Sequence, residues 1–336
     1  MTATATKVAV LGAGSWGTTL ADLLARKGLA VRLWAYEADV VEAVNARHEN
    51  PVFLPGASLA ASLTASADAA EVVRGADLVL SAAPSHAAAG VLSAVAAALG
   101  PGTPLVSATK GIEPTELLLM SQLAERILPG RPFAALSGPS FAQEVFAGQP
   151  TAVVSAAADP AVARLVQETF STPRFRVYSN QDVIGVELAG ALKNVIAIAA
   201  GMLEGLGLGH NPRAALITRG LAEITRLGRA MGADPLTFAG LAGMGDLILT
   251  TTGSLSRNRG LGIALAEGQS LDEYRAAHRS VAEGANTSRA AAALAARAGV
   301  EMPITANVCA ILFNGKPPRD SVSELMERDL KSEQWR

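Results

Sequence analysis

A glycine-rich segment near the start of the chain has the spacing of a phosphate-binding turn. Gly12-Ala-Gly-Ser-Trp-Gly17 follows the apolar run 8–11 and precedes a stretch, 15–27, with leucines at helical spacing. In a strand–turn–helix unit the first glycine permits a tight turn, the second lets the backbone approach a pyrophosphate, and the third lets the helix pack close to the strand. Free amide groups and the helix dipole then favour the anion. The pattern predicts dinucleotide binding at Gly12, Gly14 and Gly17; a glycine-rich structural turn is the alternative.

Lysine is rare in this chain, and two lysines stand where an ionisable group could do chemistry. Lys110 follows the predicted strand 105–108, at the sheet edge where doubly wound proteins bind ligands. Lys193 lies in an otherwise apolar helical stretch, 185–200, whose only other charge is Glu187. A partly buried lysine can be tuned to give and take a proton, whereas arginine cannot. Lys193 either extends to solvent along its apolar stem or takes part in catalysis.

A third cluster combines the residue types that bind phosphate. Asp246 follows two glycines, and Ser256, Arg257 and Asn258 stand together at the start of a predicted helix. Amide groups, a hydroxyl and a guanidinium at such a place can hold a phosphate together. The alternative is a serine N-cap beside solvated arginines.

The residues after the predicted strand 30–34 bear on the choice between NAD and NADP. An acidic residue about twenty positions after the glycines binds the ribose of NAD. Glu37 lies slightly beyond that position and is either such a residue or a solvated start of the next helix. Ala35 and Tyr36 offer no cation to a 2′-phosphate. We therefore expect NADH to be used at least comparably to NADPH.

Other kinds of catalytic site find little support in the sequence. The four histidines, at 48, 86, 210 and 278, are far apart and form no metal-ligand pattern, so we expect no metal. No Gly-x-Ser-x-Gly elbow of a serine hydrolase is present. The single cysteine, Cys309, lies in an apolar stretch and is interpreted as a buried structural thiol.

The elements that must position these residues alternate in the first half of the chain and are helical in the second. Predicted strands are 8–11, 30–34, 78–82, 105–108, 133–136, 152–155 and 175–178, with helical stretches between most of them. Such alternation predicts parallel strand–helix–strand units in a doubly wound sheet. Helical periodicity then predicts helices at 183–203, 213–231, 258–267, 271–277, 287–298, 303–313 and 321–326. We therefore expect an α/β fold: a Rossmann-type dinucleotide-binding domain over 1–182 and an all-helical substrate and catalytic domain over 183–336.

Composition excludes several classes of partner. The net charge is −2 and only 17% of the 336 residues are charged, so no basic face for nucleic acid is expected. No uninterrupted apolar run reaches the roughly 20 residues of a membrane helix. The short polar segment before Lys7 leaves no room for a signal peptide. We expect a cytoplasmic protein whose oligomeric state, a homodimer included, stays open.

In combination, eleven segments resemble the bacterial NAD(P)-dependent sn-glycerol-3-phosphate dehydrogenase family. They are GAGSWGTTLA at 12–21, LPG at 54–56, PSH at 84–86, ATKGIE at 108–113, SGPSFAQEV at 137–145, FRVYSN at 175–180, GVELAGALKNVIAIAAGM at 185–202, ITRGLAEITRLG at 217–228, LAGMGDLILT at 241–250, SRNRGLG at 256–262 and EGANT at 283–287. The resemblance implies reduction of dihydroxyacetone phosphate to sn-glycerol 3-phosphate with NAD or NADP, feeding phospholipid synthesis.

The resemblance also implies roles for particular residues. Lys193 resembles the catalytic lysine that exchanges a proton with the C2 oxygen. The implied substrate contacts are Lys110, Gly138, Ser140, Lys193, Asp246, Ser256, Arg257 and Asn258. The implied coenzyme contacts are Gly12, Gly14, Ser15, Trp16, Gly17, Tyr36, Lys110, Ala142, Arg257, Val281 and Glu283.

Two positions depart from the pattern, and two other functions compete with it. Tyr36 stands where many relatives carry arginine or histidine, and His210 stands where an acidic or small residue is usual; we have no physical account of His210.

A reductase of another small hydroxy acid, such as a ketopantoate-type enzyme, would share the two-domain plan without needing Ser256-Arg257-Asn258. A non-catalytic dinucleotide sensor would keep the glycines without needing Lys110 and Lys193.

Overall fold

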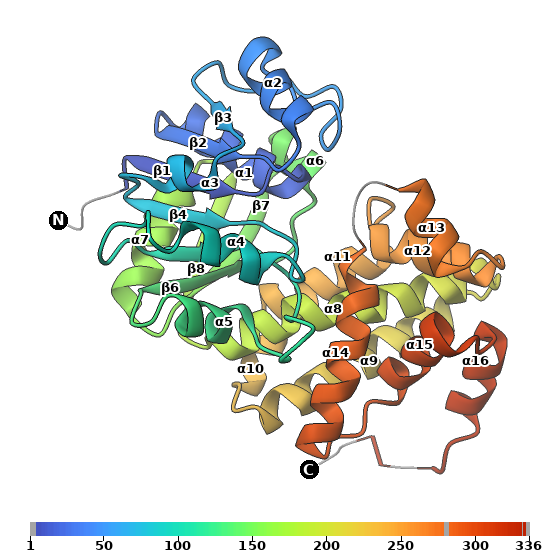
Figure 1. Cartoon of the computed structure of the whole chain (residues 1–336). Coiled ribbons are helices and arrows are strands. Elements are labelled where there is room, and N and C mark those ends of the chain that lie inside the picture. Colours follow the sequence, from blue (N-terminus) through green and yellow to red (C-terminus); the bar gives the residue numbers. More distant parts are fainter. Residues whose placement is uncertain (1–4, 279–281, 331, 334–336) are drawn as a thin grey trace.

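The computed structural model describes residues 5–278, 282–330 and 332–333. One half of the molecule contains an eight-stranded sheet, and the other half is helical (Figure 1). The strands are β1 (Lys7–Leu11), β2 (Ala30–Trp34), β3 (Thr64–Ser66), β4 (Leu78–Ser81), β5 (Leu105–Ser107), β6 (Phe133–Ser137), β7 (Thr151–Ala156) and β8 (Phe175–Asn180). Their spatial order is β3-β2-β1-β4-β5-β6-β7-β8. The first six strands have the order of a doubly wound dinucleotide-binding sheet, which confirms the expected fold class.

Helices cover both faces of the sheet. Val8 and Val10 of β1 pack in one apolar cluster with α1, α2 and α7, whereas Ala9 and Leu11 pack in a second cluster with α3, α4 and α5. Burial on both faces explains why the central strands are continuous apolar runs. The helices of this half are α1 (Ser15–Arg26), α2 (Ala38–Arg47), α3 (Ala69–Val73), α4 (Ala88–Val95), α5 (Met120–Ile127), α6 (Ala142–Phe146) and α7 (Pro160–Phe170).

The sheet differs from the sequence prediction in two ways. β3 was not predicted, because a strand of three residues shows no readable alternation. β7 departs from the predicted parallel strand–helix–strand units, because it runs antiparallel to β6 while the other paired strands are parallel. The β6–β7 connection contains only the five-residue helix α6, and an antiparallel return needs no crossover helix over the sheet.

The second half is built around α8 (Val183–Gly205), in which every residue from Gly185 to Leu203 is buried. The helices α9, α11, α12, α14 and α15 pack on it, which explains why its sequence is apolar all round. The other elements are α9 (His210–Ala230), α10 (Pro235–Phe238), the π-helix η1 (Leu241–Gly245), α11 (Asp246–Thr252), α12 (Arg257–Ala266), α13 (Leu271–Ala277), α14 (Glu283–Ala298), α15 (Pro303–Asn314) and α16 (Pro318–Met326).

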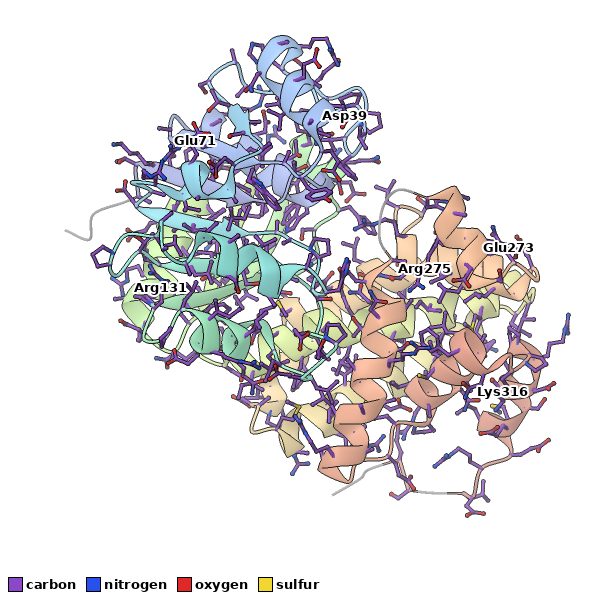
Figure 2. All side chains as sticks on the ribbon, viewed as in Figure 1. Asp39, Glu71, Arg131, Glu273, Arg275 and Lys316 are labelled. Atoms are coloured by element: carbon purple, nitrogen blue, oxygen red, sulfur yellow. The ribbon has the colours of Figure 1, made fainter. Side chains whose placement is uncertain are left out.

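The short elements between 235 and 252 were not predicted. Three glycines interrupt the helical pattern there, and the π-helix of η1 has a different residue period from an α-helix. This segment carries Asp246 to the start of α11, where its side chain is 1% exposed. Charged side chains such as Asp39 of α2 and Glu273 of α13 lie instead at the periphery (Figure 2).

By length and composition α8 could cross a membrane, but 89% of its most apolar 18-residue window is buried inside the protein. Glu187 and Lys193 interrupt its apolar sequence. Its apolar character reflects its position in the core of the helical half.

Candidate active site

The glycine turn lies at the β1–α1 junction and leaves open space at the start of α1. Gly12 has φ +111°, and a Cβ on Gly17 would lie 1.9 Å from the Gly12 carbonyl oxygen, so the backbone itself demands both glycines. A Cβ on Gly14 would meet no atom within 4 Å. Gly14 is also the N-cap of α1, which has neither a side-chain cap nor an acidic residue in its first turn. The free amides therefore face open space and suit an anion.

Other residues near this turn fit a dinucleotide. The indole Nε1 of Trp16 is buried and has no partner among the described residues. Ala142 begins α6, and its carbonyl accepts a hydrogen bond from Thr19 of α1 at 3.3 Å. Tyr36 is 82% exposed just after β2. The nearby arginine, Arg32, already donates to two backbone carbonyls and so is not free for a 2′-phosphate.

Two lysines from opposite halves of the molecule meet at one carboxylate. Lys110 Nζ donates to Asp246 Oδ2 at 2.7 Å and to the carbonyl of Gly138 at 2.9 Å. Lys193 Nζ donates to Asp246 Oδ1 at 2.5 Å and to Thr250 Oγ1 at 2.7 Å. This cluster joins the loop after β5, the loop after β6, the middle of α8 and the first turn of α11. The Lys193 ammonium is buried here and does not extend to solvent.

The surroundings of Lys193 shift its pKa. Burial lowers the pKa of Lys193 to about 7; the Asp246 carboxylate opposes this change, and the neighbouring charge of Lys110 adds to it. An ammonium with a pKa near neutrality can both donate and accept a proton at physiological pH. Arginine at this place could not.

A close helix crossing brings the start of α12 to the lysines. A Cβ on Gly201 of α8 would lie 2.0 Å from the Arg259 carbonyl, and one on Gly262 of α12 would lie 2.0 Å from the Ile198 carbonyl. Only glycine at both positions permits this approach.

The start of α12 carries the predicted serine, arginine and asparagine. Ser256 is the N-cap, and its Oγ accepts from Arg259 N at 3.2 Å, so the capping role that the sequence left as an alternative is present. Its hydroxyl proton stays available for a ligand. Arg257 is exposed at the first position of the helix.

A chain of amides links this helix start to both halves of the molecule. Asn194 Nδ2 donates to the Lys110 carbonyl at 3.1 Å, and Asn258 Nδ2 donates to Asn194 Oδ1 at 2.9 Å. The Gly284 amide donates to Asn258 Oδ1 at 3.0 Å. Asn194 and Thr250 were missed in the sequence analysis. The signals for them were adjacency to Lys193 and a helical i+4 spacing from Asp246.

The remaining predicted contacts lie in the loop after β6 and around the start of α14. Glu283, at the start of α14, accepts from Ser85 N at 3.2 Å and from Ser85 Oγ at 2.5 Å, which joins the loop after β4 to the helical half. The Gly138 carbonyl also accepts from Ser140 Oγ at 2.9 Å. Val281 lies outside the described residues. The structure thus gathers the lysines, Asp246 and Gly138 directly, and places the glycine turn with Ser15, Trp16 and Tyr36 along the β1–β2 edge.

The cysteine and histidine side chains were given no part in the predicted chemistry. No group of three or more metal-ligating side chains occurs within the described ranges. Cys309 is half-buried, not fully buried as interpreted from sequence, and burial raises the pKa of its thiol. His210 is exposed at the first position of α9.

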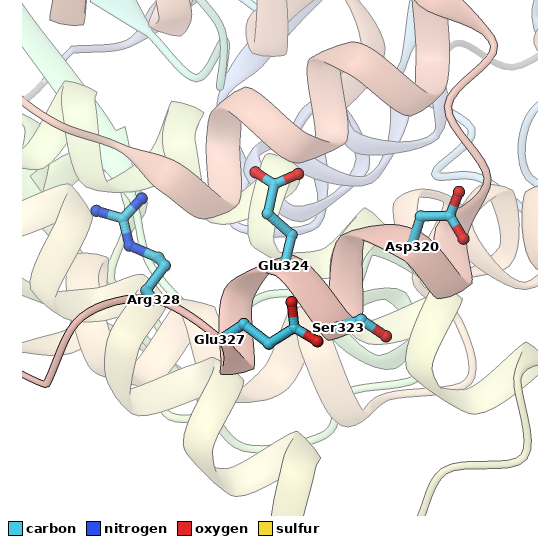
Figure 3. A pocket seen from close by; sticks show the side chains of 5 residues that line it. All are labelled: Asp320, Ser323, Glu324, Glu327 and Arg328. Atoms are coloured by element: carbon cyan, nitrogen blue, oxygen red, sulfur yellow. The ribbon is translucent and has the colours of Figure 1, made fainter.

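A hollow of about 530 Å³ lies along α16 and is lined by Asp320, Ser323, Glu324, Glu327 and Arg328 (Figure 3). Glu324 is ion-paired with Lys316, and Arg328 with Glu301. None of the clustered lysine-site residues lines this hollow, so it is a groove between ion-paired surface side chains and not the candidate site.

Sequence models for two parts of one family match most of the chain. The model described as the NAD-dependent glycerol-3-phosphate dehydrogenase N-terminus matches residues 7–163, and that described as the C-terminus matches residues 182–323. The chain belongs to the glycerol-3-phosphate dehydrogenase family. The expected family, NAD(P)-dependent glycerol-3-phosphate dehydrogenase activity and NAD(P) coenzyme are thereby confirmed.

Individual members of the glycerol-3-phosphate dehydrogenase family are similar to this chain over nearly the whole length of both proteins. The glycerol-3-phosphate dehydrogenase [NAD(P)+] of Geobacter sulfurreducens is 57% identical over 98% of this chain and 99% of its own. The crystal structure of glycerol-3-phosphate dehydrogenase from Coxiella burnetii is 42% identical, covering 96% of this chain and 99% of its own, with a TM-score of 0.93. The Saccharomyces cerevisiae enzyme is 28% identical, covering 96% of this chain and 99% of its own, with a TM-score of 0.81.

Proposed function

We propose that the chain interconverts dihydroxyacetone phosphate and sn-glycerol 3-phosphate, with Lys193 as the group that exchanges a proton with the C2 oxygen. The observation that carries this assignment is the buried Lys193 ammonium, held by Asp246 and Thr250 beside Lys110 at the meeting of the two halves. When bound, the nicotinamide supplies or accepts the hydride at C2.

The glycine turn is proposed to hold the coenzyme. Gly12 and Gly17 maintain the tight turn, and the amides around Gly14 meet the pyrophosphate at the positive end of α1. Ser15, Trp16, Tyr36, Ala142, Arg257, Val281 and Glu283 are the further coenzyme contacts that we propose. Comparable use of NADH and NADPH stays a prediction, which is supported by the hydrogen bonds that Arg32 already donates to two backbone carbonyls.

Lys193 and Lys110 are proposed to act on the reacting carbonyl in different ways. As the hydride arrives at C2, negative charge develops on the ketone oxygen, and the Lys193 ammonium stabilises it and transfers a proton to it. In the reverse direction the neutral amine removes that proton. Lys110 adds a second positive charge and contacts both substrate and coenzyme, while Asp246 orients both lysines through separate oxygens. Gly138 and Ser140 line the substrate beside Lys110.

The start of α12 is proposed to hold the substrate phosphate. The Ser256 hydroxyl, the Arg257 guanidinium and the second amide proton of Asn258 surround the positive end of a ten-residue helix. Anchoring the phosphate there converts binding energy at a remote group into orientation of the carbonyl.

Several wider assignments are supported by the family resemblance and remain proposals. They are a cytoplasmic location, a homodimer, and supply of glycerol phosphate for phospholipid synthesis. We also propose the domain division 1–182 and 183–336, which is supported by the end of β8 at Asn180 and the start of α8 at Val183.

The proposed substrate is tested by steady-state turnover of NADH and NADPH with dihydroxyacetone phosphate and with pyruvate-type ketones. We expect efficient turnover of the phosphorylated ketone alone. Faster turnover of an unphosphorylated 2-oxo acid would contradict the phosphate anchor, and absence of turnover with every ketone would contradict the role of Lys193.

A further inference from the structure

Glu187 is a buried carboxylate that the proposed chemistry does not use. It lies on α8, is 7% exposed, and accepts hydrogen bonds from Ser121 N at 2.8 Å and from Ser121 Oγ. Burial raises the pKa of Glu187 to about 7, and the ion pairs found in the described part of the chain do not include it. A buried carboxylate that is not in an ion pair is costly to the fold, so what its hydrogen bonds hold in place matters.

Ser121 connects this carboxylate to the lysine cluster. It is the second residue of α5, so Glu187 caps a helix of the sheet half from the helical half. The loop that leads into α5 begins directly after Lys110. Glu113 ties this loop internally, because its carboxylate accepts from the amides of Thr115 and Glu116 at 3.0 and 2.7 Å. These bonds hold together the part of the loop that lies between Lys110 and α5.

Three residues on one face of α8 hold both ends of that loop. Positions 187, 190 and 194 have the i, i+3, i+7 spacing of a single helical face. Asn194 binds the Lys110 carbonyl at 3.1 Å. A Cβ on Gly190 would lie 3.6 Å from Lys110 Cγ, so the lysine stem packs against the helix backbone at that point. Glu187 holds the far end through Ser121.

We propose that Glu187 is a positioning residue, which fixes the 111–119 loop on α8 through Ser121 and thereby sets where the Lys110 ammonium lies relative to Asp246. This inference rests on the proposed role of Lys110. In this proposal Glu187 contacts neither substrate nor coenzyme, and it acts only through the 111–119 loop.

Two substitutions at position 187 separate geometry from charge. Glu187→Leu removes both acceptors, and we expect kcat/KM for dihydroxyacetone phosphate to fall about 10- to 100-fold, since a misplacement near 1 Å can cost about 10²-fold. Glu187→Gln preserves both contacts: its carbonyl accepts from the Ser121 amide, and its NH2 donates to the Ser121 hydroxyl. The Gln variant should therefore retain most of the activity.

A double-mutant cycle with Lys110→Met tests whether Glu187 acts through that lysine. We expect Glu187→Leu to add little to the loss already caused by Lys110→Met, because the two changes remove the same interaction. Losses that multiply would overturn the positioning role while leaving the proposed function of Lys110 in place. Full activity of Lys110→Met alone would instead contradict that proposed function, and the positioning role with it.

A second buried carboxylate provides the matched control for folding. Glu223 is 2% exposed, accepts from Ile304 N at 2.7 Å and from Thr305 N and Oγ1 at 3.3 Å, and so caps α15. Glu223→Leu should lower Tm as Glu187→Leu does, but kcat/KM of the folded enzyme should not change.

If Glu187→Leu fails to fold, Ser121→Ala and Thr305→Ala repeat the comparison, since each removes one hydroxyl donor to a buried carboxylate. We expect a several-fold loss of kcat/KM, about that of one hydrogen bond, in Ser121→Ala only. Lower Tm with unchanged kcat/KM in Ser121→Ala would show that Glu187 merely stabilises the fold.

Discussion

Gly201 of α8 and Gly262 of α12 lie against each other where the two helices cross. A Cβ on either residue would lie within 3.0 Å of the Cα of the other, and 2.0 Å from a backbone carbonyl oxygen of the opposite helix. This contact brings the start of α12, with Ser256 and Arg257, to the helix that carries Lys193. The crossing therefore connects the proposed phosphate anchor to the proposed proton donor.

Gly201→Ala should separate the two helices. We expect destabilisation of about 1–3 kcal/mol, as for overpacked cores, together with a higher KM for dihydroxyacetone phosphate. Thermal melting and steady-state kinetics measure the two effects. Gly90→Ala in α4 is the control, because its Cβ would meet no atom within 4 Å and alanine favours a helix. Equal behaviour of the two variants would contradict the role of the crossing.

Lys193→Met should remove proton transfer while preserving the apolar stem. Proton transfer contributes about 10²- to 10⁴-fold, and loss of the charge opposite the alkoxide adds to this, so kcat should fall at least about 10³-fold. Lys193→Arg keeps the charge without a practical proton donor and should remain severely impaired. Coenzyme binding, followed by fluorescence titration, should survive in both variants. Turnover of Lys193→Met within about ten-fold of the unmodified enzyme would make Lys193 structural.

The lowered pKa of Lys193 predicts opposite pH profiles for the two directions. Ketone reduction needs the ammonium, so its kcat/KM should fall as the pH rises through about 7. Oxidation of glycerol 3-phosphate needs the neutral amine, so its kcat/KM should rise through the same pH and then level off. The pH dependence of kcat/KM, measured at saturating coenzyme in each direction, checks both expectations. Profiles that change in the same direction would refute the assignment of Lys193 as the group that exchanges the proton.

Arg257→Ala tests the phosphate anchor. A charge-assisted guanidinium–phosphate contact contributes roughly 1.5–3 kcal/mol, or about 10- to 150-fold in kcat/KM for dihydroxyacetone phosphate. Unphosphorylated dihydroxyacetone should lose much less. The comparison of the two ketones is the measurement, and equal losses would assign Arg257 to structure or coenzyme binding.

Gly14→Asp should abolish coenzyme binding without unfolding the protein. The new Cβ meets no protein atom, whereas the carboxylate would repel a pyrophosphate at the start of α1. Gly17→Ala is the contrasting variant, because its Cβ would lie 1.9 Å from the Gly12 carbonyl and should lower Tm. Coenzyme titration beside melting curves separates the two. Unchanged affinity in Gly14→Asp would remove this loop from the coenzyme site.

Much of the architecture could be read from the sequence because it depends on neighbours along the chain. The turn Gly12–Gly17 lies between an apolar run and a segment with helical periodicity. The spacing of apolar residues in these two segments indicates which of their faces are buried. Where that local signal is short or broken, prediction failed. The three-residue β3 is too short to show an alternating pattern, and the direction of β7 depends on its partner β6. The glycines at 240–245 interrupt the helical pattern, so the π-helix there could not be predicted.

The sequence by itself determined the fold class, the glycine turn and, through a whole-chain resemblance, the family. Only the tertiary structure decided which side chains meet. Asp246 lies 136 residues from Lys110 and 53 from Lys193, and no local period relates them. Their contact depends on how α8 and the strand edge pack, and on the two glycines that let α12 approach α8. Local patterns encode which face of each element is buried, whereas side-chain contacts between distant elements arise from the crossing geometry of the assembled core.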